Sequence, residues 1–422
     1  MKGPPAGKSA SQRESTGDAP RILLVDCDMF YVQVARLEDP DGAGRETLLI
    51  VGGAATGRGV VTSASYEVRE YGVRSGMPTA QALKLCPHAK VVPVSRRACA
   101  YRSSRVREVL QELSPVVQAA SIDEFYLDLS GTGRLFHQES LECTARRIRQ
   151  EVHRRTEISV SVGGGCRKLI AKLAAGRAKP AGVFVVSPGG EGQFMRGFEL
   201  REIPGIGPAL AKTLEGKGLV RVEDILPVDE AWLGRWLGPS RARWLWERAR
   251  GLDSSRVIPG EPRKSISSER TFGSDLSDER DMERELLRLA GSVGGSLRKQ
   301  GLQGRTITVK IRDGDFKTRQ ASNTLPDPVE SDSTIFSVAL DLFRGLRGKR
   351  RVGVRLLGVG VSSLVEGDSR TQLDMFEAGT ASEPARDRVV SRVMDDLRGR
   401  FGDNAILPGR MLEEAGDGST DD

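Results

Sequence analysis

The order of hydrophobic and polar positions predicts several folded segments along the chain. Between residues 97 and 186, short apolar runs of strand type alternate with segments whose apolar positions recur every three to four residues. This interleaving predicts an α/β layer. Residues 32–96 predict a compact segment of mixed helix and strand. The elements expected in the α/β layer are helices at 97–113, 139–155 and 167–177 and strands at 116–129, 158–163 and 182–186.

The second half of the chain carries different patterns. Residues 187–253 are helical in pattern, and residues 254–264, with Pro, Gly and charged side chains, predict a linker. Beyond the linker, residues 305–312 alternate strictly between apolar and polar side chains, as a half-buried strand does. Together with a helix expected at 279–299 and a strand at 352–361, this predicts a sheet backed by helices.

Two apolar runs of strand type contain acidic residues at their ends. Residues 22–31 read ILLVDCDMFY and residues 121–128 read SIDEFYLD. Carboxylates at a buried strand end are costly unless a cation neutralises them. Mg²⁺ prefers a few carboxylates together with substrate phosphates. The pair of strands therefore predicts metal-dependent phosphoryl or nucleotidyl transfer, and the alternative is a set of surface acids at strand ends.

The alternation of side chains along a strand limits which acids can share a metal. On a regular strand Asp123 and Glu124 point to opposite faces, so both can bind one metal only if the backbone bends there. Asp26 and Asp28 would share a face, but Asp28 stands just before a helix expected at 29–37. We therefore expect Asp28 to be the N-cap of that helix rather than a third ligand.

Charge is unevenly distributed over the 422 residues, whose formal net charge is +7. Residues 363–422 hold 14 acids and 7 Arg, a net charge of −7, so the first 362 residues carry +14. A basic body suggests a polyanionic partner, and an acidic tail suggests a separate role. Residues 1–20 are expected to be a disordered leader. The odd number of cysteines without a CxxC pattern favours free thiols in a reducing cytoplasm, and no apolar run reaches membrane-span length.

A glycine hairpin precedes a helix in the third segment of the chain. The sequence PGIGP at 204–208 runs directly into residues 209–216, which are expected to be helical. Gly205 and Gly207 would let the backbone approach a DNA phosphate closely, and amides at a helix start bind phosphate. This pattern resembles a helix-hairpin-helix. Four tryptophans nearby are expected to form the core of this small domain: Trp232, Trp236, Trp244 and Trp246.

Two further segments suggest contacts with partners. In the strand at 305–312 the outward positions carry hydroxyls and cations suited to phosphates, with a solvated outer face as an equal alternative. These positions are Thr306, Thr308, Lys310 and Arg312. In the acidic tail, the peptide 372–376 could anchor in a hydrophobic pocket while its flanks stay mobile, although such a peptide also arises by chance. Its anchoring side chains are Gln372, Leu373, Met375 and Phe376.

Several ordered motifs together carry a family resemblance. They are VDCDMFY, SYEVREYGVRSGMP, SIDEFYLDLSGT, AKLAAGRAKPAG, PGIG and QLDMF. In this order they resemble the Y-family translesion DNA polymerases of the DinB, polymerase IV type. The resemblance implies a multidomain α/β and α+β fold in the form of a right hand. Its parts would be a ferredoxin-like palm at 21–31 and 97–186, small fingers at 32–96, a helical thumb at 187–253, and a little finger at 265–362, followed by an acidic tail at 363–422 with a clamp-binding peptide.

The resemblance also implies roles for individual residues. Asp26, Asp123, Glu124 and the backbone carbonyl of Cys27 match ligands of two Mg²⁺ ions, and the three carboxylates are the catalytic set. Tyr66, Arg69 and Lys179 match residues that hold the incoming triphosphate. Phe30 and Tyr31 match an aromatic pair beside the deoxyribose, with Tyr31 as the steric gate. The residues that match the roof over the nascent base pair are small to medium, which implies low fidelity: Val60, Thr62 and Gly76.

The chain departs from the family pattern at three places. Ala35 replaces the usual glutamate, the segment 163–168 reads GGGCRK where the family usually has G-I-[SA]-x-N-K, and Gly176 stands where an acidic residue is expected. None of these positions is a metal ligand, so the chemistry should survive. Palm rigidity, nucleotide affinity and turnover are the properties that the departures would alter.

Two classes of function fit these observations. The first is a template-directed DNA polymerase of low fidelity and low processivity that copies past lesions, with primer-template DNA, dNTP and the bacterial sliding clamp as partners. It would be a monomeric, cytoplasmic protein associated with the nucleoid. The second is a non-catalytic relative that binds DNA and clamp as an adaptor. We favour the enzyme, because an adaptor has no physical need for clustered carboxylates that repel DNA.

Overall fold

The computed structural model describes residues 19–132, 139–348, 350–367, 383–402 and 405–409. The chain forms two compact units, and each is described by itself. The first holds residues up to 261 apart from 56–58, and the second holds 56–58 and the residues from 262. The predicted leader, apart from its last two residues, and the predicted clamp-binding peptide lie outside the described residues.

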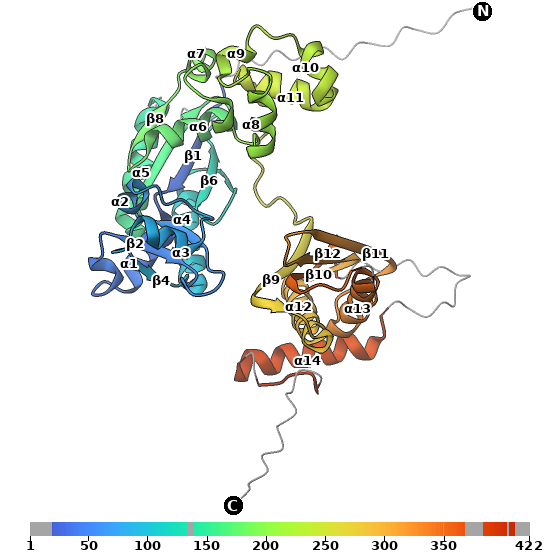
Figure 1. The fold of residues 1–422 in the computed structure, drawn as a ribbon. Coiled ribbons are helices and arrows are strands. Elements are labelled where there is room, and N and C mark those ends of the chain that lie inside the picture. The colour runs from blue at the N-terminus through green and yellow to red at the C-terminus, as the bar shows by residue number, and fades with distance from the viewer. Residues whose placement is uncertain (1–18, 133–138, 349, 368–382, 403–404, 410–422) are drawn as a thin grey trace, which may run out of the picture. The chain divides into compact units, whose positions relative to one another are not determined.

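The first unit contains a five-stranded sheet of strand order β5-β6-β1-β7-β8. Figure 1 labels its strands β1, β6 and β8. The central strand β1 is antiparallel to both of its neighbours. These strands match the runs expected from the sequence, and the strands predicted within 116–129 are β5 and β6. The bounds are β1 Ile22–Cys27, β5 Val116–Ala119, β6 Glu124–Asp128, β7 Val160–Gly165 and β8 Val183–Val185.

Helices cover both faces of this sheet, so β1 is apolar on both sides and its alternating positions enter two different cores. Leu23 and Val25 pack with helices α4 and α5, whereas Ile22 and Leu24 pack against α6. A strand buried on both faces reads as a continuous apolar run, which explains ILLV. The helices are α1 Phe30–Glu38, α4 Arg96–Leu113, α5 Leu141–Thr156 and α6 Lys168–Ala178.

Two smaller parts complete the first unit. One is a three-stranded sheet of order β3-β2-β4 with two short helices. The other is helical, and its partly buried tryptophans pack against its apolar core, which confirms the interpretation of the tryptophan cluster. The elements of both parts are β2 Leu49–Gly52, β3 Val61–Ala64, β4 Lys90–Val92, α2 Tyr66–Glu70, α3 Thr79–Leu85, α7 Glu191–Met195, α8 Pro208–Glu215, α9 Val222–Ile225, α10 Glu230–Leu237 and α11 Pro239–Ala249, with single 3-10 turns at Ala43–Arg45 and Leu200–Glu202.

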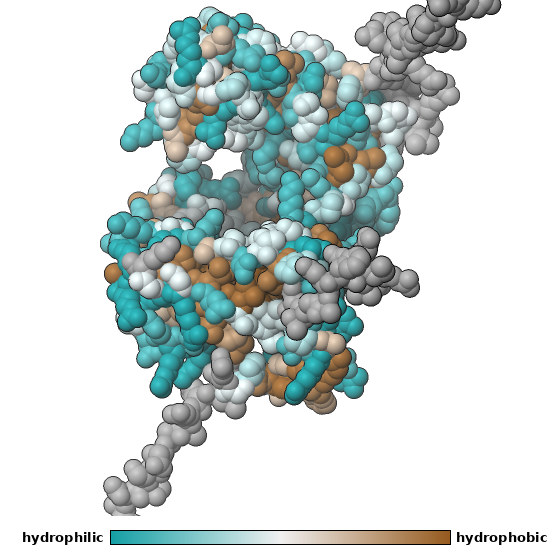
Figure 2. Space-filling view, turned by 90° about the vertical axis from the view of Figure 1, so that its right-hand side faces the viewer, coloured by the Kyte–Doolittle hydropathy of each residue, from teal (hydrophilic) through white to brown (hydrophobic). Residues whose placement is uncertain are grey.

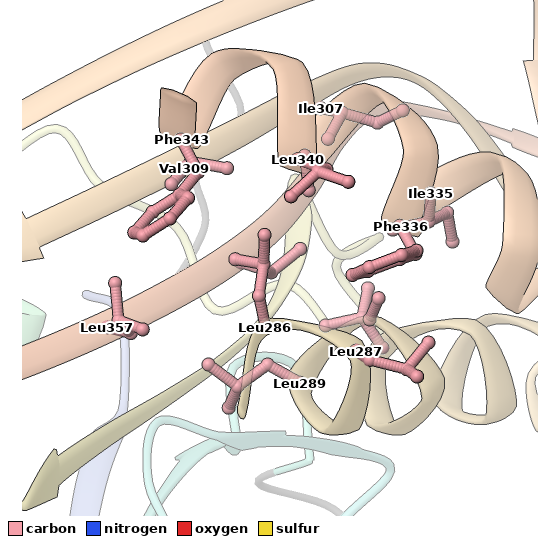
Figure 3. Packing of buried hydrophobic residues seen from close by; sticks show 14 of the residues in the cluster. Leu286, Leu287, Leu289, Ile307, Val309, Ile335, Phe336, Leu340, Phe343 and Leu357 are labelled. Atoms are coloured by element: carbon pink, nitrogen blue, oxygen red, sulfur yellow. The ribbon is translucent and has the colours of Figure 1, made fainter. Parts of the chain in front are cut away.

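The second unit is a four-stranded antiparallel sheet of order β11-β10-β12-β9, with two long helices on one face. Figure 3 shows Leu286 of α12 and Leu340 of α13 among the side chains that meet Val309 of the sheet. The predicted sheet backed by helices is therefore present. Its elements are β9 Ser265–Leu276, β10 Leu302–Asp313, β11 Thr318–Val329, β12 Val354–Glu366, α12 Glu279–Lys299, α13 Asp332–Gly348 and α14 Ala385–Phe401.

The helix α14 joins this unit through charged contacts. Arg298, whose side chain is 5 % exposed, donates to Asp395 of α14 at 2.6 Å and to Asp332 of α13 at 2.9 Å. The apolar side chains Val389 and Phe401 of α14 are 61 % and 71 % exposed. The folded unit thus extends past residue 362, where we expected the little finger to end.

Hydrophilic side chains cover much of the surface in Figure 2, with apolar patches between them.

The glycine run 163–165 lets β7 lie directly against α6. A Cβ on Gly163 would stand 2.0 Å from the backbone nitrogen of Ala175, and a Cβ on Gly164 would stand 2.9 Å from a methyl group of Leu23. Gly163 keeps the first glycine of the family motif, so the departures in this run are Gly164 and Gly165, whose Cβ positions face neighbouring side chains. Side chains at these positions would have to push the helix or neighbouring side chains away.

We expect Gly163→Ala to destabilise the first unit by about 3 kcal/mol, the upper part of the usual cost of overpacking a core. Thermal unfolding followed by circular dichroism measures this effect. Gly176→Ala is the matched control, because that helical glycine has nothing within 4 Å of its Cβ position. The control should raise stability by about 0.5–1 kcal/mol, since Ala favours the helix. Equal melting temperatures for Gly163→Ala and the wild type would contradict the close-packing argument.

Candidate active site

Asp26 and Glu124 face the same side of the central sheet. They are direct partners across the β1–β6 pair, just as Leu24 is the partner of Tyr126. Leu24 and Tyr126 pack with Ala171 and Ala175 of α6, so the alternation of the strands also directs Asp26 and Glu124 to the α6 side. Two acids that are distant in the sequence are thereby brought together at one end of the strand pair.

The backbone bends just before Glu124. Such a bend is the condition for Asp123 and Glu124 to bind one metal. The strand β6 begins at Glu124, and residues 120–123 form bends. The amide of Cys27 donates to the carbonyl of Asp123 at 2.9 Å, which ties the bend to the end of β1. The Ser121 hydroxyl donates to Asp123 Oδ1 at 2.5 Å and accepts from the Glu124 amide at 3.1 Å. Ser121 thus orients the Asp123 carboxylate, a role that we did not assign from the sequence.

Two lysines from α6 and its end pair with these acids. Lys172 Nζ donates to both carboxylate oxygens of Glu124 at 2.6 Å. Lys179 Nζ lies 2.7 Å from Asp26 Oδ1. Lys172 was missed by the sequence interpretation. The signal that could have found it is its spacing of seven residues from Lys179, which is two helical turns and places both on one side of the helix.

The charge balance of the site remains negative. Burial raises the pKa of Asp26 from 3.8 to about 6; Lys179 opposes this shift, and the charges of Glu124 and Asp123 add to it. The raised pKa of Asp26 is therefore due mainly to its burial, and the repulsion among the three acids adds to it. Hard divalent cations suit such a set of oxygen donors.

The described residues contain no group of three His, Cys, Asp or Glu side chains already arranged to hold a metal ion. The contacts explain this, because Asp26 and Glu124 each point to a lysine. Asp123 is held by Ser121 instead. The donor set nevertheless fits a divalent metal by its chemistry, since its acids are adjacent, partly buried and short of positive charge. The assignment of Asp26, Asp123, Glu124 and the Cys27 carbonyl as ligands stays a prediction.

The prediction that Asp28 is an N-cap is wrong. The N-cap of α1 is Met29, which has φ 36° and no side-chain cap bond. Asp28 is instead 2 % exposed, and hydroxyl groups of Tyr66 and Ser161 donate to its carboxylate. Asp28 accepts these hydrogen bonds from segments distant in the sequence. The local sequence pattern does not predict such partners.

The predicted nucleotide residues lie around this acidic end of the sheet. Phe30 is 1 % exposed, and its ring meets that of Tyr31 edge-on with 5.6 Å between centroids. Burial, and after it the charge of Asp123, raises the pKa of the Tyr31 hydroxyl. The guanidinium carbon of Arg69 lies 5.0 Å from the centroid of the Tyr66 ring. The Tyr66 hydroxyl donates to Asp28 Oδ1 at 3.1 Å.

The predicted roof residues lie close together in the small sheet. Val60 forms a bridge with Pro78, and the amide of Gly76 donates to the carbonyl of Val61 at 2.8 Å. Thr62 is the next residue in β3. Gly76 has φ +83°, a conformation that favours glycine, so its lack of a side chain has a local backbone reason. The three positions thus lie on adjacent backbone segments, and their contact with a base pair stays a prediction.

The predicted DNA contacts are built in different ways. Gly205 has φ +101°, and a Cβ there would stand 2.6 Å from the Trp244 ring, so the hairpin needs glycine at this position. Gly207 is the N-cap of α8.

In the second unit Ile307, Val309 and Ile311 are fully buried, so the expected alternation of β10 is confirmed.

The outer face of β10 carries the hydroxyls and cations expected there. Thr306 Oγ1 lies 2.9 Å from Thr324 Oγ1, and Thr308 Oγ1 lies 2.8 Å from Ser322 Oγ. Arg312 donates to Thr318 at 2.9 Å. Lys310 forms an ion pair with Glu269 at 2.9 Å, so a phosphate would have to compete with that carboxylate.

Comparison with known proteins identifies the family. Residues 25–176 match the model of the impB/mucB/samB family, and residues 263–375 match the model of its C-terminal domain. The chain is 37 % identical to DNA polymerase IV of Caulobacter vibrioides, over 93 % of this chain and 94 % of the relative. It is 38 % identical to DNA polymerase IV of Alkalilimnicola ehrlichii, over 84 % of this chain and 99 % of the relative.

Solved structures agree with the sequence comparisons. A Y-family DNA polymerase chimera, Dbh-Dpo4(243-245)-Dbh, superposes with a TM-score of 0.74 at 28 % identity, over 82 % of this chain and 99 % of the chimera. An insertion ternary complex of Dbh DNA polymerase gives a TM-score of 0.58 at 27 % identity, over 82 % of this chain and 99 % of that polymerase.

The chain belongs to the Y-family DNA polymerases, of the DinB, polymerase IV type. The predicted multidomain polymerase fold and the predicted translesion DNA polymerase activity are confirmed, and the adaptor alternative is not favoured. Binding of DNA and dNTP and a general dependence on divalent metal follow from this family membership. No helix in the described part of the chain is long and apolar enough to cross a membrane.

Proposed function

We propose that this polymerase adds nucleotides with two Mg²⁺ ions held by Asp26, Asp123, Glu124 and the carbonyl of Cys27. When bound, the two ions would supply charge stabilisation to the attacking and leaving oxygens of an in-line displacement. The single observation that supports the proposal is the direct pairing of Asp26 with Glu124 across β1 and β6. The bend at Ser121–Asp123 brings the third carboxylate to the same strand end.

The lysines and aromatic residues would prepare the site for the incoming nucleotide. Lys179 would exchange its contact with Asp26 for a phosphate oxygen, since a cation near developing phosphate charge stabilises the transition state. Tyr66 and Arg69 would bind the same triphosphate from the α2 side. Phe30, buried beneath Tyr31, would fix the gate ring beside the sugar. Val60, Thr62 and Gly76 would form a loose roof, which fits low fidelity.

DNA would be held mainly through its backbone. The hairpin at Gly205 and Gly207 offers amides at the start of α8, and the outer face of β10 offers Thr306, Thr308, Lys310 and Arg312. Contacts of this kind position a duplex without reading its sequence, and salt weakens them. Such contacts would favour distributive synthesis. As the family resemblance implies, we expect a monomeric enzyme that works on DNA in the cytoplasm, at the nucleoid.

Primer extension on undamaged and lesion-bearing templates tests the proposed activity. We expect extension with Mg²⁺ and its loss with a chelator, and insertion opposite at least one lesion that stops a replicative polymerase. Absence of template-directed extension under all metal conditions would contradict the two-metal proposal for this chain.

We also propose that residues 372–376 bind the bacterial sliding clamp, with Leu373, Met375 and Phe376 as apolar anchors and Gln372 as the polar one. A weak peptide contact to a ring on the DNA raises the local concentration of the polymerase and thereby its processivity. The net charge of −7 over residues 363–422 would keep this peptide away from DNA.

Deletion of residues 372–376 should leave distributive synthesis on a short primer unchanged and remove stimulation by the clamp. Linkage commonly raises apparent affinity by about 10²–10⁴-fold, so the loss should be evident in product length at low enzyme concentration. Deletion of residues 377–381, the neighbouring pentapeptide, is the matched control. Persistent clamp stimulation after deletion of 372–376 would show that the main contact lies elsewhere.

A further inference from the structure

Asp28 occupies a buried position two residues after the proposed metal ligand Asp26. Its own backbone is fixed, because its amide donates to the carbonyl of Ser159 at 3.0 Å. Gln33 of α1 reinforces this link through its side-chain amide, which donates to the carbonyls of Asp28 and Ser159 and accepts from the Ser159 amide at 2.7 Å. Asp28 therefore cannot move independently of the central sheet.

The Asp28 carboxylate accepts four hydrogen bonds. Oδ1 accepts from the hydroxyls of Ser161 at 2.7 Å and Tyr66 at 3.1 Å. Oδ2 accepts from the Ser159 hydroxyl at 3.0 Å and the Ala181 amide at 3.0 Å. Four donors occupy the acceptor sites of a carboxylate. Asp28 thus differs from Asp26 and Glu124, which pair with lysines, and needs no metal to be satisfied.

The four donors come from three separate parts of the fold. Ser161 belongs to β7 and Ser159 directly precedes this strand. The hydroxyls of both serines hold the carboxylate to the sheet. Tyr66 begins α2 beside the small sheet. Ala181 lies two residues after Lys179, just beyond the end of α6. One buried carboxylate therefore connects the sheet to two segments that each contribute a proposed triphosphate contact.

We propose that Asp28 is a positioning residue for the incoming nucleotide, fixing the Tyr66 hydroxyl and the segment 179–181 relative to each other. The inference rests on the proposed roles of Tyr66 and Lys179. Without the carboxylate, the Tyr66 hydroxyl and the Ala181 amide would lose their shared acceptor, and the nucleotide would have to order the two segments relative to each other. That ordering costs binding free energy, so the loss falls on nucleotide affinity more than on the chemical step.

Asp28→Asn is the test variant, because it keeps the shape and replaces one acceptor oxygen by a donor group. We expect the KM for dNTP in single-nucleotide insertion to rise about tenfold, as befits the loss of a hydrogen bond to a charged group. The kcat should change by less than about threefold if that bond acts equally in ground and transition states. Asp128→Asn is the matched control, since Asp128 pairs with Ile22 at the opposite end of β1. Its KM should equal that of the wild type.

A double-mutant cycle separates positioning from general destabilisation. Tyr66→Phe removes only the hydroxyl that donates to Asp28. We expect Asp28→Asn to raise the KM for dNTP less in the Tyr66→Phe variant than in the wild type. If Asp28→Asn does not fold, Ser161→Ala replaces it in the cycle, because it removes one donor and keeps the charge. Additive effects on KM, or a fall in kcat and melting temperature at constant KM, would overturn the inference.

The same measurements distinguish this inference from the proposal on which it rests. Lys179→Ala and Tyr66→Ala should both raise the KM for dNTP. If neither does, the assignment of the triphosphate contacts is wrong. If both do while folded Asp28→Asn keeps the wild-type KM, the contacts are right and Asp28 does not position them.

Discussion

Asp123→Asn and Glu124→Gln should each reduce nucleotide addition by at least about 10³-fold, the upper range for losing one electrostatic group that stabilises a transition state. Each substitution removes a negative charge from a cluster of three acids that share one strand end. The proposed metal pair would then lose a ligand and part of its charge compensation. Lys172, which binds both oxygens of Glu124, would face a neutral amide in Glu124→Gln.

Primer-template binding should change little in both variants, because cationic contacts elsewhere supply most of the affinity for DNA. Single-turnover insertion measures the chemical step, and fluorescence anisotropy of a labelled primer-template measures binding. Asp128→Asn is again the control, as it makes the same change at the far end of β6. Extension at the wild-type rate by Asp123→Asn or Glu124→Gln would refute the metal assignment, whereas loss of DNA binding would point to a folding defect.

Tyr31→Ala should admit ribonucleotides. The Tyr31 ring packs edge-on against the fully buried Phe30, so its position is set before a nucleotide arrives. If the ring excludes ribonucleotides by a steric clash with their 2′-hydroxyl, removal of the ring also removes that selectivity. We expect the ratio of kcat/KM for dNTP over rNTP to fall about 10–100-fold, which corresponds to about 1.4–2.7 kcal/mol of lost discrimination.

Two controls separate a steric gate from a hydroxyl effect. Tyr31→Phe keeps the ring and should keep most of the sugar selectivity. Tyr101→Ala removes an exposed aromatic side chain from α4 and should leave selectivity at the wild-type value. Unchanged selectivity in Tyr31→Ala would place the gate at another residue, and a loss of selectivity in Tyr31→Phe would assign it to the hydroxyl.

The sequence by itself determined the elements and the acids that matter. The strict alternation of β10 requires one buried face, and the structure has Ile307, Val309 and Ile311 fully buried. The apolar run at Ile22–Val25 predicted a buried strand, and the helix expected at 279–299 has those bounds. These features depend on local periodicity and on the side chains alone, so they are visible without a partner segment.

Only the tertiary structure decided which side chains meet at the strand ends. Register places Asp26 opposite Glu124, and the packing of α6 directs Lys172 and Lys179 to those acids. Asp28 was predicted to be a cap because its local sequence fits one, yet its four partners come from segments distant in the sequence. Hydrogen bonds of a buried carboxylate depend on which donors lie within about 3 Å, and a linear pattern carries no such distances.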